Sequence, residues 1–373
     1  MQSSEQKTLL GLTLQELTSF VEGFGQPSYR GQQLFAALYG QRIGSMNELS
    51  TLPKSFRSRL SENGFQVGVP RIERRFVSSD GTVRYLIGLE DGQTVETVWM
   101  PGGDGGEAGD GSQAGAQLHT SGQRERATIC VSSQAGCAVD CKFCLTAQLG
   151  VNRNLTAGEI VGQVCVVLNE RKVLPPNDRV NLVFMGMGEP FLNYENFMTA
   201  VRLLTEGVGI PESRMTVSTA GIVPRIYDLG SEPIRPKLAI SINASNDKLR
   251  TQLMPINRKW NLEKLIAAAR DFPLREREKL TFEYVLLAGI NDAAQNAREL
   301  SDLVRGLRAK VNLIALNSGP GIAFQSPEQE RVLAFQRTLV DQRIPAFIRR
   351  PRGRDIYAAC GQLKRTAEVA LAV

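Results

Sequence analysis

From residue 127 to about residue 350 the chain alternates short apolar runs with amphipathic segments, and this alternation restricts the fold more than any other feature. Strands that alternate with helices form a parallel sheet with right-handed crossovers. About 245 residues is also the size of a (β/α) barrel. Six or seven strands rather than eight predict an α/β fold with a partial, open barrel of the (β/α)6 type. The predicted strands are 127–132, 179–185, 214–219, 236–242, 280–288, 310–316 and 346–350, and helices fit between them, for example over 156–169, 262–270 and 293–307.

The barrel is assigned to residues 126–373, and two smaller units precede it. Residues 1–65 are predicted to form a helical domain, in which Thr13 and Glu16 have the spacing of a capping box and a second helix follows over 29–39. Residues 66–125 are predicted to form an antiparallel β extension, because 71–100 alternate in polarity around two Asp-Gly turns. Within it, the low-complexity stretch 102–122 is predicted to be a flexible loop that leaves His119 in solvent.

Composition excludes several classes of protein. No run of about 18 apolar residues exists, and the first ten residues are polar, so we expect a cytoplasmic chain that does not cross a membrane. Six cysteines are too few for a disulfide scaffold, and four of them fall between positions 130 and 144. The net charge is +6, with basic clusters near 54–75 and 349–354 that become plausible RNA contacts when other features point to RNA.

Cys137, Cys141 and Cys144 form a C-x3-C-x2-C motif just after the first predicted barrel strand, on the side where barrel active sites lie. Three thiolates can bind three irons of a [4Fe–4S] cluster and leave the fourth iron open to chelate S-adenosylmethionine. Ferredoxin-type carriers need a fourth cysteine in the local run, and none is present. The alternative is zinc, with Cys130 as the fourth ligand, in an RNA-binding protein without catalysis.

Polar or small residues also follow several other predicted strands. Because strand carboxyl ends meet at one face of a barrel, we expect these residues to form a cofactor pocket in which Glu189 accepts a hydrogen bond from an ammonium group. Each could separately cap a loop. Cys165 lies on an apolar helix and is interpreted as core. The pocket residues are Gly188, Glu189, Ser218, Ser241, Ile242, Asn243 and Asn317.

Several segments spread over nearly the whole chain resemble one known family. They are SYRGQQLFAALYG, VETV, ATICVSSQAGCAVDCKFCLTAQLGVNRNL, VFMGMGEPFLN, VSTAG and RGRDIYAACGQL. They are similar to the RlmN family, dual-specificity RNA methyltransferases that methylate C2 of adenine by radical S-adenosylmethionine chemistry. A sister family that methylates C8 of adenine shares the cluster motif and the ACGQ segment, and it stays an alternative. The stretch CLTAQLGVNRNL resembles the C2 enzymes more closely.

The resemblance implies a radical-SAM barrel and a role for each remaining polar group. Cys360 would take a methyl group from one S-adenosylmethionine, and a second molecule would supply the radical that removes a hydrogen from that methyl. The resulting carbon would join enzyme and RNA covalently, Glu96 of VETV would accept the C2 proton, and Cys130 would release the product by forming a disulfide with Cys360. Without the resemblance, Cys130 would be interpreted as a buried strand residue and Cys360 as a small apolar packing residue.

The resemblance also implies partners and exposes two departures. The implied substrates are an adenine of 23S rRNA near the peptidyl transferase centre and the adenine 3′ of the tRNA anticodon. A flavodoxin- or ferredoxin-like donor would supply electrons to a monomeric enzyme. The family usually has Ser-Leu-His where this chain has Ser241-Ile242-Asn243, and an aromatic residue and proline near Asn317. We interpret both departures as changes in the cofactor pocket rather than as loss of activity.

Overall fold

The computed structural model describes residues 7–102, 107–108, 127–319 and 321–363. Within them, one sheet runs through most of the molecule in the strand order β3-β4-β5-β7-β10-β11-β12-β13-β14-β15-β6. Its barrel strands are β7 (Ala127–Cys130), β10 (Val180–Phe184), β11 (Met215–Thr219), β12 (Lys237–Ser241), β13 (Leu280–Leu286), β14 (Ala309–Ala315) and β15 (Ala346–Arg349). Within this set, consecutive strands pair in parallel, which confirms the predicted α/β partial barrel.

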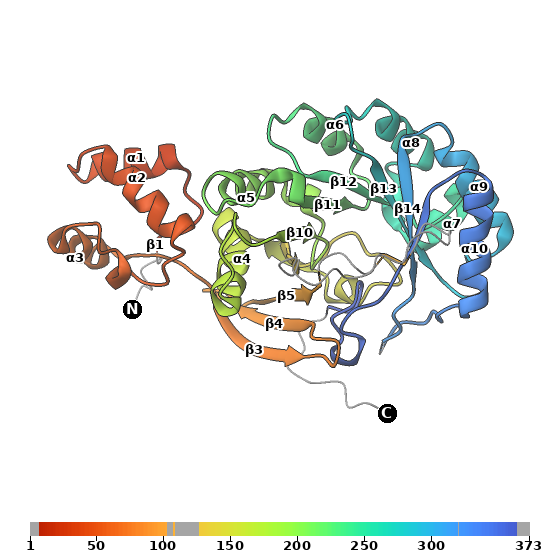
Figure 1. The fold of residues 1–373 in the computed structure, drawn as a ribbon, viewed down its shortest axis with the longest axis horizontal. Helices are drawn as coiled ribbons and strands as arrows, with labels where there is room; N and C mark the ends of the chain where they lie inside the picture. Colours follow the sequence, from red (N-terminus) through yellow and green to blue (C-terminus); the bar gives the residue numbers. More distant parts are fainter. Residues whose placement is uncertain (1–6, 103–106, 109–126, 320, 364–373) are drawn as a thin grey trace.

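Helices connect the barrel strands and cover the outer face of the curved sheet (Figure 1). The helix predicted over 156–169 begins at a cap, because Thr156 and Glu159 form a capping box at the start of α4. The longer helices are α4 (Ala157–Arg171), α5 (Tyr194–Glu206), α6 (Val223–Ser231), α7 (Asp247–Leu253), α8 (Leu262–Asp271), α9 (Ala294–Val304) and α10 (Gln329–Asp341). Short helical turns are η3 (Leu145–Leu149), η4 (Pro190–Asn193), η5 (Glu212–Arg214), η6 (Pro255–Arg258) and η7 (Arg354–Ile356).

The antiparallel extension continues the barrel sheet. It consists of β3 (Arg71–Val77), β4 (Val83–Gly88) and β5 (Thr94–Pro101), and β5 pairs antiparallel with β7 so that Val98 lies opposite Cys130. Every residue of β4 is buried. One face packs on α4, where the Arg171 Nε donates to the Tyr85 hydroxyl over 2.8 Å. Arg84, also on β4, pairs with Glu96 of β5.

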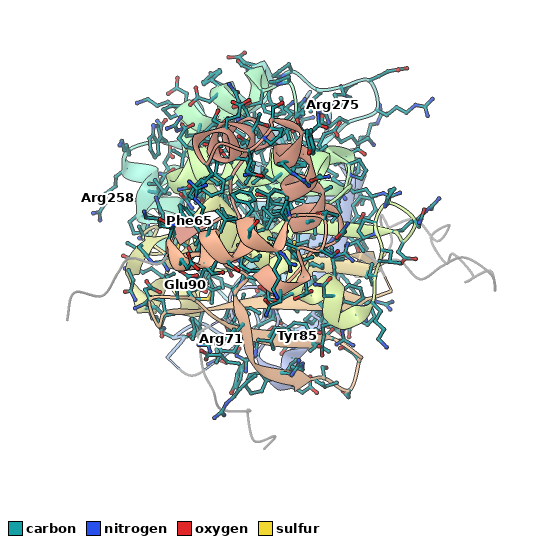
Figure 2. All side chains as sticks on the ribbon, turned by 90° about the vertical axis from the view of Figure 1, so that its left-hand side faces the viewer. Phe65, Arg71, Tyr85, Glu90, Arg258 and Arg275 are labelled. Atoms are coloured by element: carbon teal, nitrogen blue, oxygen red, sulfur yellow. The ribbon has the colours of Figure 1, made fainter. Side chains whose placement is uncertain are left out.

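The N-terminal unit contains the predicted capped helix. α1 (Leu14–Gly23) starts at the Thr13–Glu16 capping box, and α2 (Tyr29–Phe35) continues into a π-helical turn, η1 (Ala36–Gly40). A further turn, η2 (Met46–Glu48), precedes α3 (Lys54–Glu62), and β1 (Lys7–Thr8) pairs with β2 (Phe65–Gln66). Figure 2, turned so that these helices face the viewer, shows them above Arg71 and Tyr85 of the extension.

The N-terminal unit is held against α4 by close backbone contact and by one buried side chain. The Arg42 Nε donates a hydrogen bond to the Asn169 Oδ1 over 2.9 Å. The Asn169 Nδ2 donates in return to the Arg42 backbone oxygen over 2.8 Å. A Cβ on Gly158 would lie 2.1 Å from the Leu10 oxygen, so only glycine permits this approach. The proposed domain limits of 1–65, 66–125 and 126–373 remain a prediction.

The predicted flexible loop over 102–122, including His119, lies largely outside the described residues. Of its described part, β6 (Glu107–Ala108) pairs antiparallel with β15. Two further short strands, β8 (Gln134–Gly136) and β9 (Val151–Asn154), pair with each other beside the first barrel strand. Among the helices that the structure describes, none has both the length and the apolar character needed to cross a membrane.

Candidate active site

Two adjoining cavities open in the interior of the partial barrel. The larger has a volume of about 490 Å³ and the smaller about 160 Å³. They share wall residues from the cysteine loop, from β13 and from the C-terminal loop, among them Cys144, Glu283, Asn317 and Cys360. Deep clefts that combine apolar walls with a few polar groups are typical of cofactor and substrate sites.

The three motif cysteines line the smaller cavity. Gly136 determines where their loop begins: its φ is +99°, and a Cβ there would lie 1.9 Å from the Gly150 oxygen. The Cys137 amide then donates to this same oxygen over 2.8 Å. Burial raises the pKa of Cys137 and of Cys141, so both are neutral thiols at pH 7 without a cation beside them. Binding of these thiols to a metal would therefore release their protons.

Cys130 stands apart from this group. It lies at the end of β7 and lines the larger cavity together with Cys360. Burial raises the pKa of the Cys130 thiol well above its ordinary value, and the nearby Cys360 thiol raises it further. Cys360 is exposed to solvent, yet burial of its thiol among the surrounding protein atoms also raises its pKa. Cys144 and Cys360 line both cavities, whereas Cys137 and Cys141 line only the smaller and Cys130 only the larger. Cys165 is buried in the core as predicted.

A zinc site with Cys130 as the fourth ligand does not fit this arrangement. A single zinc ion needs four ligands converging within about 2.3 Å of one point. Among the described residues, no three cysteine, histidine or acidic side chains are close enough to hold one metal ion. An iron–sulfur cluster makes a different demand, because its thiolates bind separate irons. The all-thiol donor set around the smaller cavity is compatible with such a cluster.

Glu189 lines the smaller cavity with the three cysteines and is the N-cap residue of η4, in the segment that follows β10. Its two carboxylate oxygens accept hydrogen bonds from the Phe191 amide over 3.1 Å and the Ala220 amide over 2.7 Å. Burial nevertheless raises its pKa to about 7. Gly188 and Glu189 both line the smaller cavity, as do Ser218, Ser241, Asn243 and Asn317.

Glu283 of β13 was not identified from the sequence. It faces both cavities, and its Oε2 accepts a hydrogen bond from the Ser218 hydroxyl over 2.6 Å and a longer one from Ser241 over 3.4 Å. The only sequence signal is a single acidic residue within the otherwise apolar strand LTFEYVL. Glu283 is thus a second acidic residue in the wall of the smaller cavity, in addition to Glu189.

Ile242 and Asn243 differ in their surroundings. Ile242 is fully buried and does not line either cavity, although its backbone oxygen accepts from the Arg250 Nε over 3.0 Å. Asn243 has a φ of +54°, and its side-chain oxygen accepts from the Val285 amide over 2.8 Å. Arg250, also missed from the sequence, is fully buried and donates to the Ala220 oxygen over 2.7 Å, so it ties the ends of β11 and β12 together.

Glu96 is buried and does not line the cavities. It lies on β5 in an ion pair with Arg84, and both side chains are 0 % exposed. The register Val98↔Cys130 makes Glu96 a diagonal neighbour of Cys130 on the same sheet face. The Ser132 hydroxyl also donates to the Glu96 backbone oxygen over 2.6 Å. The predicted base is therefore close to the predicted resolving cysteine but held by a guanidinium.

The larger cavity has a strongly basic wall. Arg214, Lys237, Lys279 and Lys310 lie at the amino ends of the barrel strands, opposite the cysteine loop, so the cavity extends through the barrel. Basic residues of the late cluster line it as well, namely Arg349, Arg350 and Arg352. The acidic Glu278 in this wall is already paired with Arg235 over 2.8 Å. The wall is suited to an anionic polymer.

Comparisons with known proteins agree with these features. The family model of the Radical SAM superfamily matches residues 131–300, and that of the ribosomal RNA large subunit methyltransferase N-terminal domain matches residues 7–65. The "Probable dual-specificity RNA methyltransferase RlmN" of Koribacter versatilis (strain Ellin345) is 62% identical over 351 residues, covering 94% of this chain and 100% of the relative. The "Dual-specificity RNA methyltransferase RlmN" of Syntrophobacter fumaroxidans is 44% identical over 94% of this chain and 96% of the relative.

A solved structure is similar over nearly the whole chain. The radical SAM methyltransferase from Sphaerobacter thermophilus has a TM-score of 0.85 and 41% sequence identity, covering 96% of this chain and 100% of that protein. Identity at this level over nearly complete chains shows common descent and a common fold. The chain therefore belongs to the RlmN family of dual-specificity RNA methyltransferases, within the radical SAM superfamily.

Proposed function

We propose that this chain methylates C2 of adenine in 23S rRNA, near the peptidyl transferase centre, and in tRNA, at the adenine 3′ of the anticodon. Family membership makes it an S-adenosylmethionine-dependent RNA methyltransferase that uses a [4Fe–4S] cluster. The observation that carries the finer proposal is the placement of five cysteines around two adjoining cavities: Cys137 and Cys141 line only the smaller, Cys130 lines only the larger, and Cys144 and Cys360 line both.

The three thiols of Cys137, Cys141 and Cys144 would hold the cluster, and Glu189, Ser218 and Ser241 would contact S-adenosylmethionine. When bound, the cluster and S-adenosylmethionine supply one-electron cleavage of a sulfonium bond. Two molecules of S-adenosylmethionine are needed per turnover, one as methyl donor and one as radical source. We further propose a monomeric enzyme, with electrons from a flavodoxin- or ferredoxin-like donor.

The chain's own residues would perform the remaining steps in the larger cavity. Cys360 carries the methyl carbon as S-methylcysteine; once one hydrogen atom has been removed from it, that carbon bonds to adenine C2, and the adduct radical would lose one electron to the oxidised cluster. Glu96 accepts the C2 proton, for which its carboxylate must turn away from Arg84. The Cys130 thiolate then attacks the Cys360 sulfur, the sulfur–carbon bond breaks, and the electron pair leaves with the base, which takes a proton. A thiol reductant restores both cysteines.

The charge of the larger cavity suits RNA. Its basic wall neutralises phosphates, and the reacting adenine must leave its stack to reach Cys360, as in other base-modifying enzymes. The N-terminal helical unit, fixed to α4, would contact the RNA from outside the barrel. Adenine C8 methylation is the second candidate, because it would use the same cysteines.

The test is an anaerobic assay with the reconstituted full chain, reductant, S-adenosylmethionine and an unmodified 23S rRNA fragment or tRNA. The RNA is digested, and methylated adenosines are separated by retention time, because the C2 and C8 products have the same mass. 2-Methyladenosine supports the proposal, and 8-methyladenosine assigns the chain to C8 chemistry. Cys130→Ala should remain covalently attached to RNA, whereas Cys165→Ala, a cysteine outside the scheme, should turn over normally. A colourless, zinc-containing protein without product would overturn the proposal.

A further inference from the structure

The loop that carries Cys360 is anchored to the turn between β3 and β4, more than 270 residues earlier in the chain. The Asp355 Oδ1 accepts a hydrogen bond from the Ser78 hydroxyl over 2.6 Å, and its Oδ2 accepts from the Ser79 amide over 3.1 Å. In the opposite direction, the Gly353 amide donates to the Asp80 Oδ2 over 3.0 Å. Two carboxylates, one from each segment, therefore bind the other segment's donors.

We propose that these groups form a clasp that positions Cys360 over Cys130, and that Ser78, Asp80 and Asp355 are positioning residues for the methyl-carrying cysteine. The name clasp is used below for this set of hydrogen bonds between the turn 78–82 and the loop 353–356. The inference rests on the proposed function, in which Cys360 must serve both as methyl carrier and as disulfide partner.

The turn side of the clasp is rigid. The Asp80 Oδ1 accepts from the Thr82 amide over 2.9 Å, and the Ser78 amide donates to the Thr82 oxygen over 2.8 Å. Aspartate at such a position stabilises a turn by bonding backbone two residues ahead. Thr82 is 0 % exposed, and Ser78 is also buried. These hydrogen bonds and the burial of Ser78 and Thr82 therefore fix the two groups of the turn that bind the Asp355 carboxylate, namely the Ser78 hydroxyl and the Ser79 amide.

The loop side fits the turn closely. Gly353 has a φ of +60°, and a Cβ there would lie 2.9 Å from the Thr82 Cγ2 and 2.7 Å from the Ala358 Cβ. The Ala358 amide donates to the Gly353 oxygen over 2.8 Å, so residues 353–358 form one compact unit. Hydrogen bonds from the turn to Gly353 and Asp355 thus hold the whole unit that leads into Cys360.

A second anchor lies on the other side of Cys360. The Leu145 amide, next to Cys144, donates to the Gly361 oxygen over 2.8 Å, and the Thr146 hydroxyl donates to the Leu363 oxygen over 2.7 Å. Gly361 has a φ of +80°. The Asn317 side chain also donates to the Cys360 backbone oxygen over 3.5 Å. The clasp adds a fixed point on the other side of Cys360, so the loop is held both before and after this residue.

The antiparallel extension therefore has a task beyond completing the sheet. Its β5 strand carries Glu96 next to Cys130, and its β3–β4 turn holds Cys360. A functional loop positioned by a rigid scaffold is a common arrangement. Here the scaffold that carries the predicted base also orients the predicted methyl carrier.

The test measures how readily Cys360 reaches Cys130 in the reconstituted full chain. The anaerobic protein is equilibrated with mixtures of oxidised and reduced glutathione, in which oxidised glutathione accepts the two electrons released as the two thiols become a disulfide. After acid quench and alkylation, peptide mass spectrometry gives the ratio of linked to alkylated Cys130 and Cys360 peptides. This ratio reports the effective concentration of one thiol at the other.

Asp355→Ala and Ser78→Ala should each lower the effective concentration about tenfold, which corresponds to about 1.4 kcal/mol. Because the two side chains bond to each other, the double variant should be little worse than Asp355→Ala alone. Asp355→Asn keeps acceptor oxygen without the charge and should fall between wild type and Asp355→Ala. Asp302→Ala removes an exposed aspartate of α9 that pairs only locally with Arg305, and it should match wild type.

Ratios within twofold of wild type for Asp355→Ala and Ser78→Ala, in protein with an unchanged melting temperature, would overturn the clasp. Fully additive effects in the double variant would overturn the direct Ser78–Asp355 pairing. If Asp355→Ala fails to fold, the glutathione ratios of Ser78→Ala and Asp355→Asn serve as the test of the clasp instead. Failure of the proposed function is seen separately, because wild type would then produce no 2-methyladenosine while the glutathione ratio would still respond to the clasp variants.

Discussion

The buried ion pair between Arg84 and Glu96 leads to the sharpest prediction. Both side chains are 0 % exposed, and the Arg84 guanidinium also lies 4.2 Å from the centroid of the Phe76 ring. Glu96→Gln preserves the shape of the side chain but removes the charge that compensates the guanidinium in a site closed to water. Removing one member of a fully buried ion pair costs about 3–5 kcal/mol, because a desolvated charge remains.

The assay is thermal unfolding of the anaerobic protein. At roughly 2 °C per kcal/mol for a chain of this size, Glu96→Gln should lower the melting temperature by roughly 6–10 °C. The double variant Arg84→Met/Glu96→Leu removes both charges and should recover most of this loss, because an apolar pair of similar volume is commonly as stable as a buried ion pair. A loss under 2 °C in Glu96→Gln, or a double variant less stable than the single one, would refute the reasoning.

The same variants separate stability from chemistry. Glu96→Gln should stall with RNA still bound covalently, because no group accepts the C2 proton. The double variant should be stable and equally stalled. Normal release of methylated RNA by the double variant would remove Glu96 from the role of base while leaving the stability argument intact.

Three further predictions concern other parts of the site. Cys137→Ala should lose most of its iron after reconstitution, whereas Cys165→Ala should keep it, and equal iron contents in both would contradict the ligand assignment. The pKa of Glu189 is raised to about 7 from an ordinary 4.5, so the folded state binds this proton more tightly than the unfolded state does. The contribution of the protonated Glu189 to the free energy of unfolding is therefore fully present below pH 4.5. It is lost as the pH rises through 7, and the loss is a few kcal/mol at most. Melting temperatures measured from pH 5 to 8 should fall less steeply in Glu189→Gln, and identical slopes would show that this carboxyl does not titrate as described. Arg42→Ala removes two side-chain hydrogen bonds to Asn169 and Val173 and should speed proteolytic separation of the N-terminal unit from the barrel, whereas Arg59→Ala, on the exposed side of α3, should not.

Several features were determined by the sequence alone, because each depends on residues close together in the chain. The alternation of strand and helix periods predicted the parallel barrel, and the Thr13–Glu16 capping box predicted where the first helix begins. The spacing of Cys137, Cys141 and Cys144 predicted a group of thiols on one loop. Local spacing is preserved on folding, so such patterns can be read before the fold is known.

Other features were decided only by the tertiary structure. Glu283 faces the cavities because of its position in the pleat of β13, and Glu96 meets Arg84 because of the register between β4 and β5. The separation of Cys130 from the other three cysteines follows from the direction of its side chain at the end of β7. A sequence records neither the register of two strands nor the face that a polar side chain occupies.

The contact between Asp355 and Ser78 is the clearest case. Nothing near either residue in the sequence indicates a partner, because aspartate and serine are ordinary turn residues. Their contact depends on the extension joining the barrel sheet through β5 and β7, which brings the β3–β4 turn beside the C-terminal loop. Long-range hydrogen bonds of this kind follow from the summed packing of many elements, so only the folded chain determines them.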